Sequence, residues 1–336
     1  MQIRLALSCA LFAIGLAAAA PAAAAQPALS VTGKIAGPDG GWDYVTFDPV
    51  HRRLYVSRSD GVMAVDADTG KVTSKLVDAQ RTHAAVPVNR GDEIVVTSTT
   101  LGGVLIADAH TGAVLASIKT GTKPDGAFFE PVTGLVWVMD NAGGGVSLID
   151  VKARSKIGVI PVEGALESPA TDGKGRVFIN VEDKGEIAVL DAHSRKVTAH
   201  FKLAGCDEPS GLAYSPPEQR LVAVCANGVA KVVQAADGKE VASLPIGLRG
   251  DTAVYDSRRR LVFVPTGADG KLSLISPATA KVVGVVRTQT GARTQALDPR
   301  SGTLYLPAAD FAPPAQPGGR PTPIAGTFVV LKVGEK

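Results

Sequence analysis

Residues 53–72 read RLYVSRSDGVMAVDADTGKV. The stretch contains two apolar runs with a polar turn between them, and a second polar turn follows the second run. The first run contains Leu54, Tyr55 and Val56, and the second ends at Asp66, just before Asp68-Thr69-Gly70. Asp closes such turns by hydrogen bonding to its own backbone, and Gly adopts positive φ values that other residues resist. The stretch therefore predicts a β-hairpin that turns into a further strand.

The apolar run at residues 54–56 recurs with a period of about 40 to 45 residues. The later copies are residues 94–96, 135–138, 177–179, 221–224, 261–264 and 304–306. This period, with several short strands and no helical pattern inside each unit, is typical of propeller blades. We predict an all-β fold: a seven-bladed β-propeller of four-stranded antiparallel blades.

The last copy of the repeat lacks its outer strand. Its third apolar run, residues 327–331, is followed by only five residues. Residues 29–36 form an apolar run that precedes Pro38-Asp39-Gly40, as outer strands elsewhere precede their links. We predict that this N-terminal strand completes the last blade, which would pair two edges that otherwise invite aggregation.

The N-terminus has the pattern of a signal peptide. Arg4 precedes an apolar run from Leu5 to Leu16, and an Ala-rich segment ends at Ala25. We expect cleavage near Ala25 and a periplasmic or secreted protein. Residues 26–336 would then form one propeller domain, with a Pro/Gly-rich insertion at residues 308–326 of the last blade.

Charge and hydropathy exclude some partners. Loss of Arg4 with the expected signal peptide takes the formal net charge at pH 7 from +3 to about +2, which implies no strong general attraction to polyanions. No apolar run after the expected signal peptide reaches the length of a membrane span. We expect a monomer without a membrane span, whose partner is a small ligand or another protein.

Three stretches resemble the YVTN-type bacterial propellers, the YncE-like group. They are residues 53–57, residues 66–72, and residues 118–121 with Pro124-Asp125-Gly126. The resemblance covers the whole mature chain and weakens toward its end, where Gln234 and Ser276 replace the turn Asp. It implies a periplasmic seven-bladed propeller with a binding role; some members are reported to contact single-stranded DNA, and related propellers include lactonases and quinoprotein subunits.

Topology sorts the loops of such a propeller into two faces. The links into the blades share one face, here called the linker face, with the loops between the second and third strands. Aligning the links gives one residue per blade at the channel mouth. These mouth residues are Asp43, His83, Asp125, Glu167, Ser210, Asp251 and Arg293.

The mouth residues predict a site for a cation or a polar ligand. Asp43, His83, Asp125, Glu167 and Asp251 offer the oxygen and imidazole ligands that divalent metals use. Crowded carboxylates also raise one another's pKa values unless a cation or an arginine offsets them. The alternative is that these positions are polar turn and strand-start residues without a ligand.

Other polar residues and the insertion fall on the same face. His83 is the only histidine that topology places there, because His51, His110 and His193 fall in hairpins of the opposite face. The insertion is either disordered or a functional cover, in which Phe311 and Arg320 would serve as a lid. The shorter loops form an acidic rim, which we interpret as mostly solvated; it comprises Asp60, Asp140, Asn141, Glu182, Asp183, Asn227 and Asp269.

Cys206 and Cys225 lie on the linker face of the fifth blade. In an oxidising compartment this placement predicts a disulfide. The bridge would close a loop of about twenty residues and stabilise the fold by about 3 kcal/mol in the entropy model. The alternatives are two free cysteines, with Cys225 buried, or thiolate ligation of a soft metal near His83.

Two further functions remain open. Basic hairpins recur on the opposite face and could engage the phosphates of single-stranded DNA; they contain Arg52, Arg53, Arg90, Lys174, Arg176, Arg220, Arg258, Arg259, Arg260 and Arg300. A lactonase-like, metal-assisted hydrolase could use the carboxylates and His83 of the mouth. Motifs for haem attachment, zinc peptidases and serine hydrolases are absent from the sequence, so we favour a binding module over an enzyme.

Overall fold

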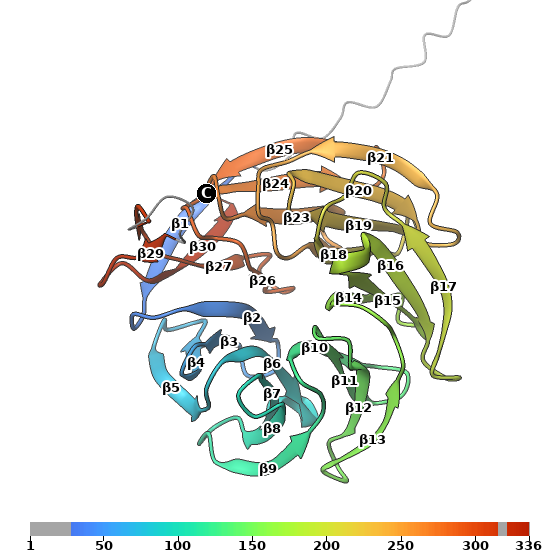
Figure 1. Cartoon of the computed structure of the whole chain (residues 1–336). Helices are drawn as coiled ribbons and strands as arrows, with labels where there is room; N and C mark the ends of the chain where they lie inside the picture. Colours follow the sequence, from blue (N-terminus) through green and yellow to red (C-terminus); the bar gives the residue numbers. More distant parts are fainter. Residues whose placement is uncertain (1–27, 315–320, 336) are drawn as a thin grey trace, which may run out of the picture.

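The computed structural model describes residues 28–314 and 321–335. The expected signal peptide at residues 1–25 and the predicted lid residue Arg320 lie outside these residues. The described chain forms seven four-stranded antiparallel sheets arranged in a ring, as Figure 1 shows. The seven-bladed β-propeller predicted from the repeat is confirmed.

The first three blades follow one another in chain order, each with its innermost strand first. Blade one contains β2 (Trp42–Asp48), β3 (Arg53–Arg58), β4 (Gly61–Asp66) and β5 (Val72–Asp78). Blade two contains β6 (Thr82–Val88), β7 (Glu93–Ser98), β8 (Gly103–Asp108) and β9 (Val114–Lys119), with the 3₁₀ turn η1 (Asn89–Gly91). Blade three contains β10 (Pro124–Glu130), β11 (Leu135–Asp140), β12 (Gly145–Asp150) and β13 (Ser155–Ile160).

The next three blades repeat this order. Blade four contains β14 (Leu166–Thr171), β15 (Arg176–Val181), β16 (Glu186–Asp191) and β17 (Lys196–Lys202), with the 3₁₀ turn η2 (Glu182–Lys184). Blade five contains β18 (Pro209–Ser215), β19 (Arg220–Cys225), β20 (Val229–Gln234) and β21 (Glu240–Pro245). Blade six contains β22 (Val254–Asp256), β23 (Leu261–Thr266), β24 (Lys271–Ser276) and β25 (Lys281–Arg287).

The seventh blade joins the two ends of the chain. It contains β26 (Ala296–Leu297), β27 (Leu304–Ala308), β30 (Val329–Glu335) and, as its outer strand, β1 (Leu29–Ala36). β1 pairs antiparallel with β30 from Leu29 opposite Glu335 to Ala36 opposite Val329. The predicted closure by the N-terminal strand is therefore confirmed, and it leaves neither strand as an open edge at this seam.

The hydrophobic core lies between the blades. The described residues form seven buried clusters, each of which combines side chains from two neighbouring blades. Trp137 of blade three, for example, packs with Ile179 of blade four, and both are completely buried. The apolar repeat thus supplies the inter-blade contacts that hold the ring together.

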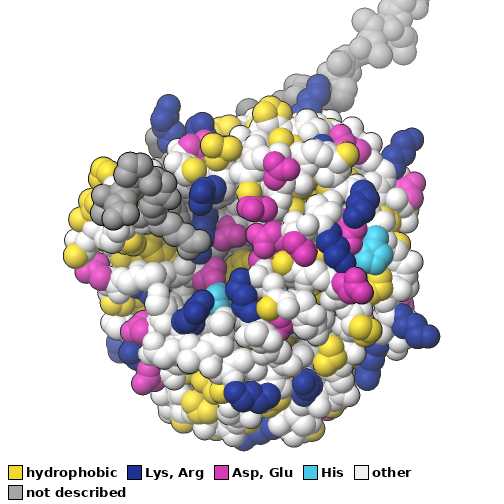
Figure 2. All heavy atoms as spheres, viewed as in Figure 1, with side chains coloured by type: hydrophobic (Ala, Val, Ile, Leu, Met, Phe, Trp, Pro, Cys, Tyr) yellow, Lys and Arg dark blue, Asp and Glu magenta, His cyan; other side chains and the backbone are white. Residues whose placement is uncertain are grey.

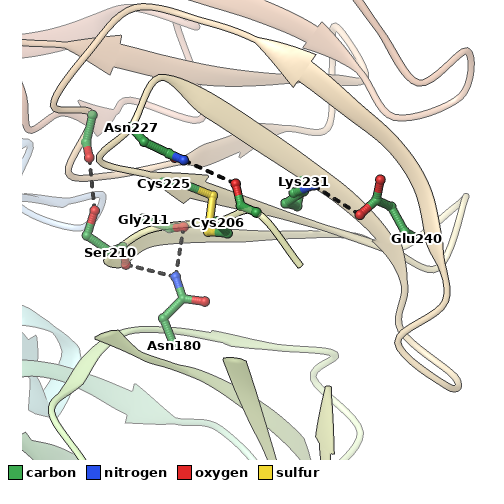
Figure 3. Close-up of a disulfide and its surroundings, with 10 residues drawn as sticks. Asn180, Cys206, Ser210, Gly211, Cys225, Asn227, Lys231 and Glu240 are labelled. Carbon is green, nitrogen blue, oxygen red and sulfur yellow. Dashed lines mark hydrogen bonds and ion pairs between the residues drawn. A yellow bond between two sulfur atoms is a disulfide. The ribbon is translucent and has the colours of Figure 1, made fainter. Parts of the chain in front are cut away.

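The predicted disulfide is present on the linker face (Figure 3). Cys206 and Cys225 form a bridge with a Cα–Cα distance of 5.2 Å. It ties the link before β18 to the end of β19, and Asn227 Nδ2 donates to the Gly205 carbonyl beside it at 3.1 Å. The alternatives of free thiols or thiolate ligation do not hold in this structure.

The insertion of the last blade has some structure of its own. Phe311–Ala312 (β28) pairs antiparallel with Thr322–Pro323 (β29). The aromatic ring of Phe311 packs against Trp42 of blade one, with ring centroids 6.1 Å apart. The described part of the chain contains no helix with the length and apolarity needed to cross a membrane.

Candidate functional site at the channel mouth

The mouth residues of blades one to five each occupy a β-bulge of the innermost strand. In blade one Trp42 pairs with Arg58, but the next pair joins Val45 to Val56. The inner strand therefore contains one residue more than its partner, and Asp43 lies in this extra stretch. The same shift follows Thr82, Pro124, Leu166 and Pro209. Bulges re-aim side chains and are frequent beside functional sites.

Buried polar side chains from neighbouring blades fix the backbone at these bulges. The Thr97 hydroxyl donates to the carbonyl of Asp125 at 2.8 Å, and the Thr294 hydroxyl donates to the carbonyl of Asp43 at 2.9 Å. The side-chain amide of Asn180 donates in the same way to the backbone of blade five. All three donors are completely buried, so losing these bonds would cost more than forming them contributes.

His83 lies between two carboxylates of the adjacent blades. Its Nδ1 atom is 2.6 Å from Oδ2 of Asp43 and 3.8 Å from Oδ1 of Asp125. Its Nε2 atom is 2.7 Å from Oγ1 of Thr99. Lys123 approaches the other side of Asp125, with Nζ 3.9 Å from Oδ2. Three of the predicted metal ligands are thus brought together.

Arg293 extends this chain of polar contacts across blade seven. Its Nε donates to Oδ2 of Asp251 at 2.7 Å, and its Nη2 donates to Oδ1 of Asp43 at 3.3 Å. The same Nη2 also donates to the carbonyl of Trp42 at 3.1 Å. Arg293 therefore offsets part of the negative charge at the mouth.

Glu167 is held by residues that the sequence did not single out. Its Oε2 accepts from the hydroxyl of Tyr44 at 3.0 Å, and its Oε1 accepts from Nδ2 of Asn141 at 2.6 Å. Asn141 also donates to Oε2 of Glu182 at 3.3 Å and accepts from Nζ of Lys123 at 2.5 Å. Asn141 of the acidic rim therefore contacts the mouth residue Glu167 directly and links it to Glu182.

Burial makes the carboxyl groups of Asp125, Glu167 and Asp251 hard to ionise. It raises the pKa of Asp125 to about 6, with His83 and Lys123 opposing the effect and Asp43 adding to it. Burial, and then the charge of Asp125, raises the pKa of Glu167 well above its usual range. Burial also raises the pKa of Asp251, although Arg293 partly offsets this. The site holds more carboxylates than bases, which favours a bound cation.

The same carboxylates raise the pKa values of His83 and Tyr44. Burial alone would lower the pKa of His83, but the hydrogen bond to Asp43 and the charge of Asp125 raise it above its ordinary value. Burial and the nearby carboxylates, Glu167 first, raise the pKa of Tyr44 well above its usual range. Figure 2 shows acidic side chains gathered at the centre of this face, with lysine, arginine and histidine side chains beside them.

Two hollows adjoin blade one, one on the side of blade two and one on the side of blade seven. A cavity of about 160 Å³ is lined by both Asp43 and His83, together with Trp42, Arg58 and Arg81 among others. A more open hollow of about 490 Å³ lies between β1 and the turn that follows β4. The smaller one adjoins the mouth cluster and is the more relevant to its chemistry.

Two of the predicted residues differ from the others in their contacts. The hydroxyl of Ser210 donates to the carbonyl of Gly250 at 2.9 Å, so it joins blades five and six (Figure 3). Phe311 is half-buried and packs against Trp42, the residue that precedes Asp43 in the chain. Its use as a lid remains a prediction, as does that of Arg320, which lies outside the described residues.

The arginines of the opposite face are largely engaged in contacts within the protein. Arg52 forms ion pairs with Asp68 at 2.7 Å and Asp298 at 3.0 Å, and Arg259 pairs with Asp256 at 2.6 Å. Further ion pairs involve Arg176 and Arg260. Such pairs reduce the positive charge that these four arginines offer to phosphates.

The comparisons with known proteins support the fold. No family model matches the sequence, and no curated protein matches it. A solved structure of hydrazine synthase from Kuenenia stuttgartiensis is similar, with a TM-score of 0.71, 17% identity, and coverage of 82% of this chain and 95% of that chain. At this identity the similarity shows a shared propeller fold and leaves the chemistry open. Membership of the YncE-like group stays a prediction.

Proposed function

We propose that this protein is a binding module that takes a divalent cation at the channel mouth. The observation that carries the proposal is the convergence of Asp43, His83 and Asp125, which each offer a ligand atom within 4.8 Å of the other two. They come from bulges of three successive blades. Two carboxylates and one imidazole suit metal ions between Mn²⁺ and Zn²⁺ in softness.

The surroundings of the cluster favour the same conclusion. Thr99 contacts Nε2 of His83, and when Nε2–H donates to that hydroxyl, Nδ1 is free to bind a metal beside the carboxylates. Such an outer contact fixes the ring orientation of a metal-binding histidine. A cation would also oppose the effect of burial on the pKa of Asp125, because it would stabilise the ionised form.

Titration calorimetry with Mn²⁺, Zn²⁺ and Ca²⁺ tests this proposal. We expect the wild type to bind at the mouth, and His83→Gln or Asp125→Asn to weaken that binding at least tenfold. His193→Gln is the matched control, because His193 is an exposed histidine in a turn of the opposite face. Affinities that are the same in His83→Gln and the wild type, for every ion that binds, would refute the proposal.

The cellular location and family are part of the proposal. We propose that residues 1–25 are a signal peptide cleaved near Ala25, and that the protein is a YncE-like periplasmic propeller. The Cys206–Cys225 disulfide supports an oxidising compartment. N-terminal sequencing of the exported protein would show Gln26 first; an intact N-terminus in the cytoplasmic fraction would argue against it.

A metal-assisted hydrolase is the second candidate. Its support is the pKa of Glu167, which burial raises well above its usual range, because a carboxyl whose pKa is raised in this way is suited to act as a general acid beside a metal. Turnover of a lactone panel with Mn²⁺ or Zn²⁺, lost in Glu167→Gln while the metal still binds, would establish it. If the wild type binds the metal but turns over no lactone, the hydrolase is refuted and only the binding-module proposal stands.

A further inference from the structure

A second cluster of metal-ligating side chains lies on the opposite face, where blades one and two meet. His51 belongs to the loop between β2 and β3, Asp92 to the loop between β6 and β7, and His110 to the turn after β8. Each offers one ligand atom within 4.8 Å of the other two. We propose that these three side chains bind a divalent transition-metal ion of the zinc class, independently of the mouth.

The spacing of the three ligands fits an ion held between them. Nε2 of His51 lies 3.7 Å from Oδ1 of Asp92, and Nε2 of His110 lies 3.6 Å from the same oxygen. These distances are too long for hydrogen bonds. In a tetrahedral zinc site with bonds of about 2.0 to 2.1 Å, neighbouring ligand atoms lie about 3.4 Å apart. Small side-chain movements therefore close the site.

A buried carboxylate orients His51 for this role. The side chain of Asp48 is only 1% exposed, and its Oδ2 lies 3.1 Å from Nδ1 of His51. An ionised carboxylate only accepts, so Nδ1 donates and Nε2 keeps its lone pair toward Asp92. Gly91 makes this contact possible, because a Cβ there would lie 2.5 Å from both partner atoms. The pair has the carboxylate–histidine arrangement of metal sites.

Backbone contacts bring the other two ligands together. The Ala109 amide donates to the carbonyl of Asp92 at 2.9 Å, which joins the two loops of blade two. The Arg53 side chain of blade one donates to the carbonyl of Ala109 at 2.5 Å. The His110 amide donates to Oδ1 of Asp108 at 3.0 Å. The three loops are thus fixed by contacts independent of a metal, as a preorganised site requires.

The exposure and chemistry of the ligands define the ion. The side chains of Asp92 and His110 are 67% and 50% exposed, so water can complete the coordination. Two imidazoles and one carboxylate favour Zn²⁺, Cu²⁺ or Ni²⁺ over Ca²⁺ and Mg²⁺. The edge-to-face contact of His51 and His110, with centroids 5.0 Å apart, keeps both rings at the site.

Metal titrations of the full-length protein with Zn²⁺ and Co²⁺ test this inference. In a His83→Gln background, which disables the mouth, we expect one Zn²⁺ site and Co²⁺ absorption bands of a protein-bound ion. His110→Gln and Asp92→Asn, both exposed positions, should weaken Zn²⁺ binding at least tenfold. His193→Gln should leave it unchanged. Zn²⁺ affinity unaltered by His110→Gln, or no Zn²⁺ binding in the His83→Gln protein, would overturn the inference.

Asp48 is inferred to be a positioning residue, and its test is separate. In Asp48→Asn the amide would donate to Nδ1 of His51 and shift the proton to Nε2, so Zn²⁺ affinity should fall about 10- to 100-fold. The Co²⁺ spectrum should change in parallel, which loss of packing alone would not explain. An Asp48→Asn protein that folds and binds Zn²⁺ as tightly as the wild type would remove Asp48 from the site.

Discussion

Nδ1 of His83 lies 2.6 Å from Oδ2 of Asp43, a contact between the innermost strands of blades two and one. Each residue occupies the bulge of its own strand. The contact therefore joins equivalent bulges of two neighbouring blades. The carboxylate of Asp125 in blade three approaches the same nitrogen at 3.8 Å. In blades one to five the mouth is therefore built from a repeated bulge whose side chains differ from blade to blade.

Cation binding at the mouth should depend on pH through Asp125. Burial raises its pKa to about 6, so the carboxyl is protonated below that pH and must lose its proton to bind a metal. We expect affinity for Mn²⁺ or Zn²⁺ to fall as the pH drops from 7 to 5, and protons to be released on binding at pH 6. Calorimetry in two buffers of different ionisation enthalpy measures this release.

Asp125→Asn is the control for that experiment. The variant should retain only the release that comes from His83, whose pKa is also raised. Proton release that is equal in the wild type and in Asp125→Asn would contradict the assignment of this carboxyl.

Arg293→Gln should strengthen divalent-cation binding while weakening the fold. The substitution removes the ion-pair partner of Asp251 and one of the two basic partners of Asp43, the other being His83. We expect a loss of about 1 to 3 kcal/mol in unfolding free energy, recovered in part when Mn²⁺ is added. Thermal melting with and without Mn²⁺ measures both effects.

The exposed Arg249, in the link before blade six, provides a matched control as Arg249→Gln. It should change neither the melting temperature nor the effect of Mn²⁺. If Arg293→Gln bound Mn²⁺ more weakly than the wild type, Arg293 would be part of the ligand site rather than a competitor of the cation.

Deletion of residues 29–36 should abolish the cooperative thermal transition. These residues form β1, which supplies the outer strand of the seventh blade and contributes Leu29 and Val31 to the packing between blades six and seven. Circular dichroism during heating measures the transition. A chain that begins at residue 26 is the control and should melt as the full chain does; normal melting of the deletion variant would refute ring closure by β1.

Loss of the disulfide should destabilise the fold without dismantling it. Cys206 and Cys225 are 19 residues apart, which corresponds to about 3 kcal/mol in the loop-entropy estimate. The variant with both cysteines changed to serine should therefore melt several degrees below the oxidised wild type. The reduced wild type should melt close to the variant. Two reactive thiols at these positions in the denatured, unreduced protein would show that the bridge does not form.

The repeat was sufficient to predict the ring and its closure, because both follow from the order of strands along the chain. The disulfide prediction needed, in addition, the expectation of an oxidising compartment. The apolar run from Leu135 to Val138 becomes β11, and the turn residues fall between strands as expected. The alignment of the links also selected Asp43, His83 and Asp125 correctly as neighbours. One aligned residue per blade was enough to identify the cluster.

The contacts around the mouth required the structure. A bulge depends on how two strands pair, which the apolar pattern does not record, so Tyr44, one residue after Asp43, was overlooked as the partner of Glu167. The buried donor Asn180 did leave a signal. It is a polar residue between the apolar residues Ile179 and Val181, and such a residue needs a buried partner. That partner lies on another blade, which explains why the sequence alone could not name it.

The central claim is that the mouth binds a divalent cation through Asp43, His83 and Asp125. The most direct measurement is a crystal structure of the protein soaked with Mn²⁺, with anomalous diffraction to locate the metal. We predict one strong anomalous peak within about 2.0 to 2.4 Å of a carboxylate oxygen of Asp43, one of Asp125 and Nδ1 of His83. A soaked crystal whose mouth shows no anomalous peak, at an Mn²⁺ concentration that saturates binding in solution, would contradict the account.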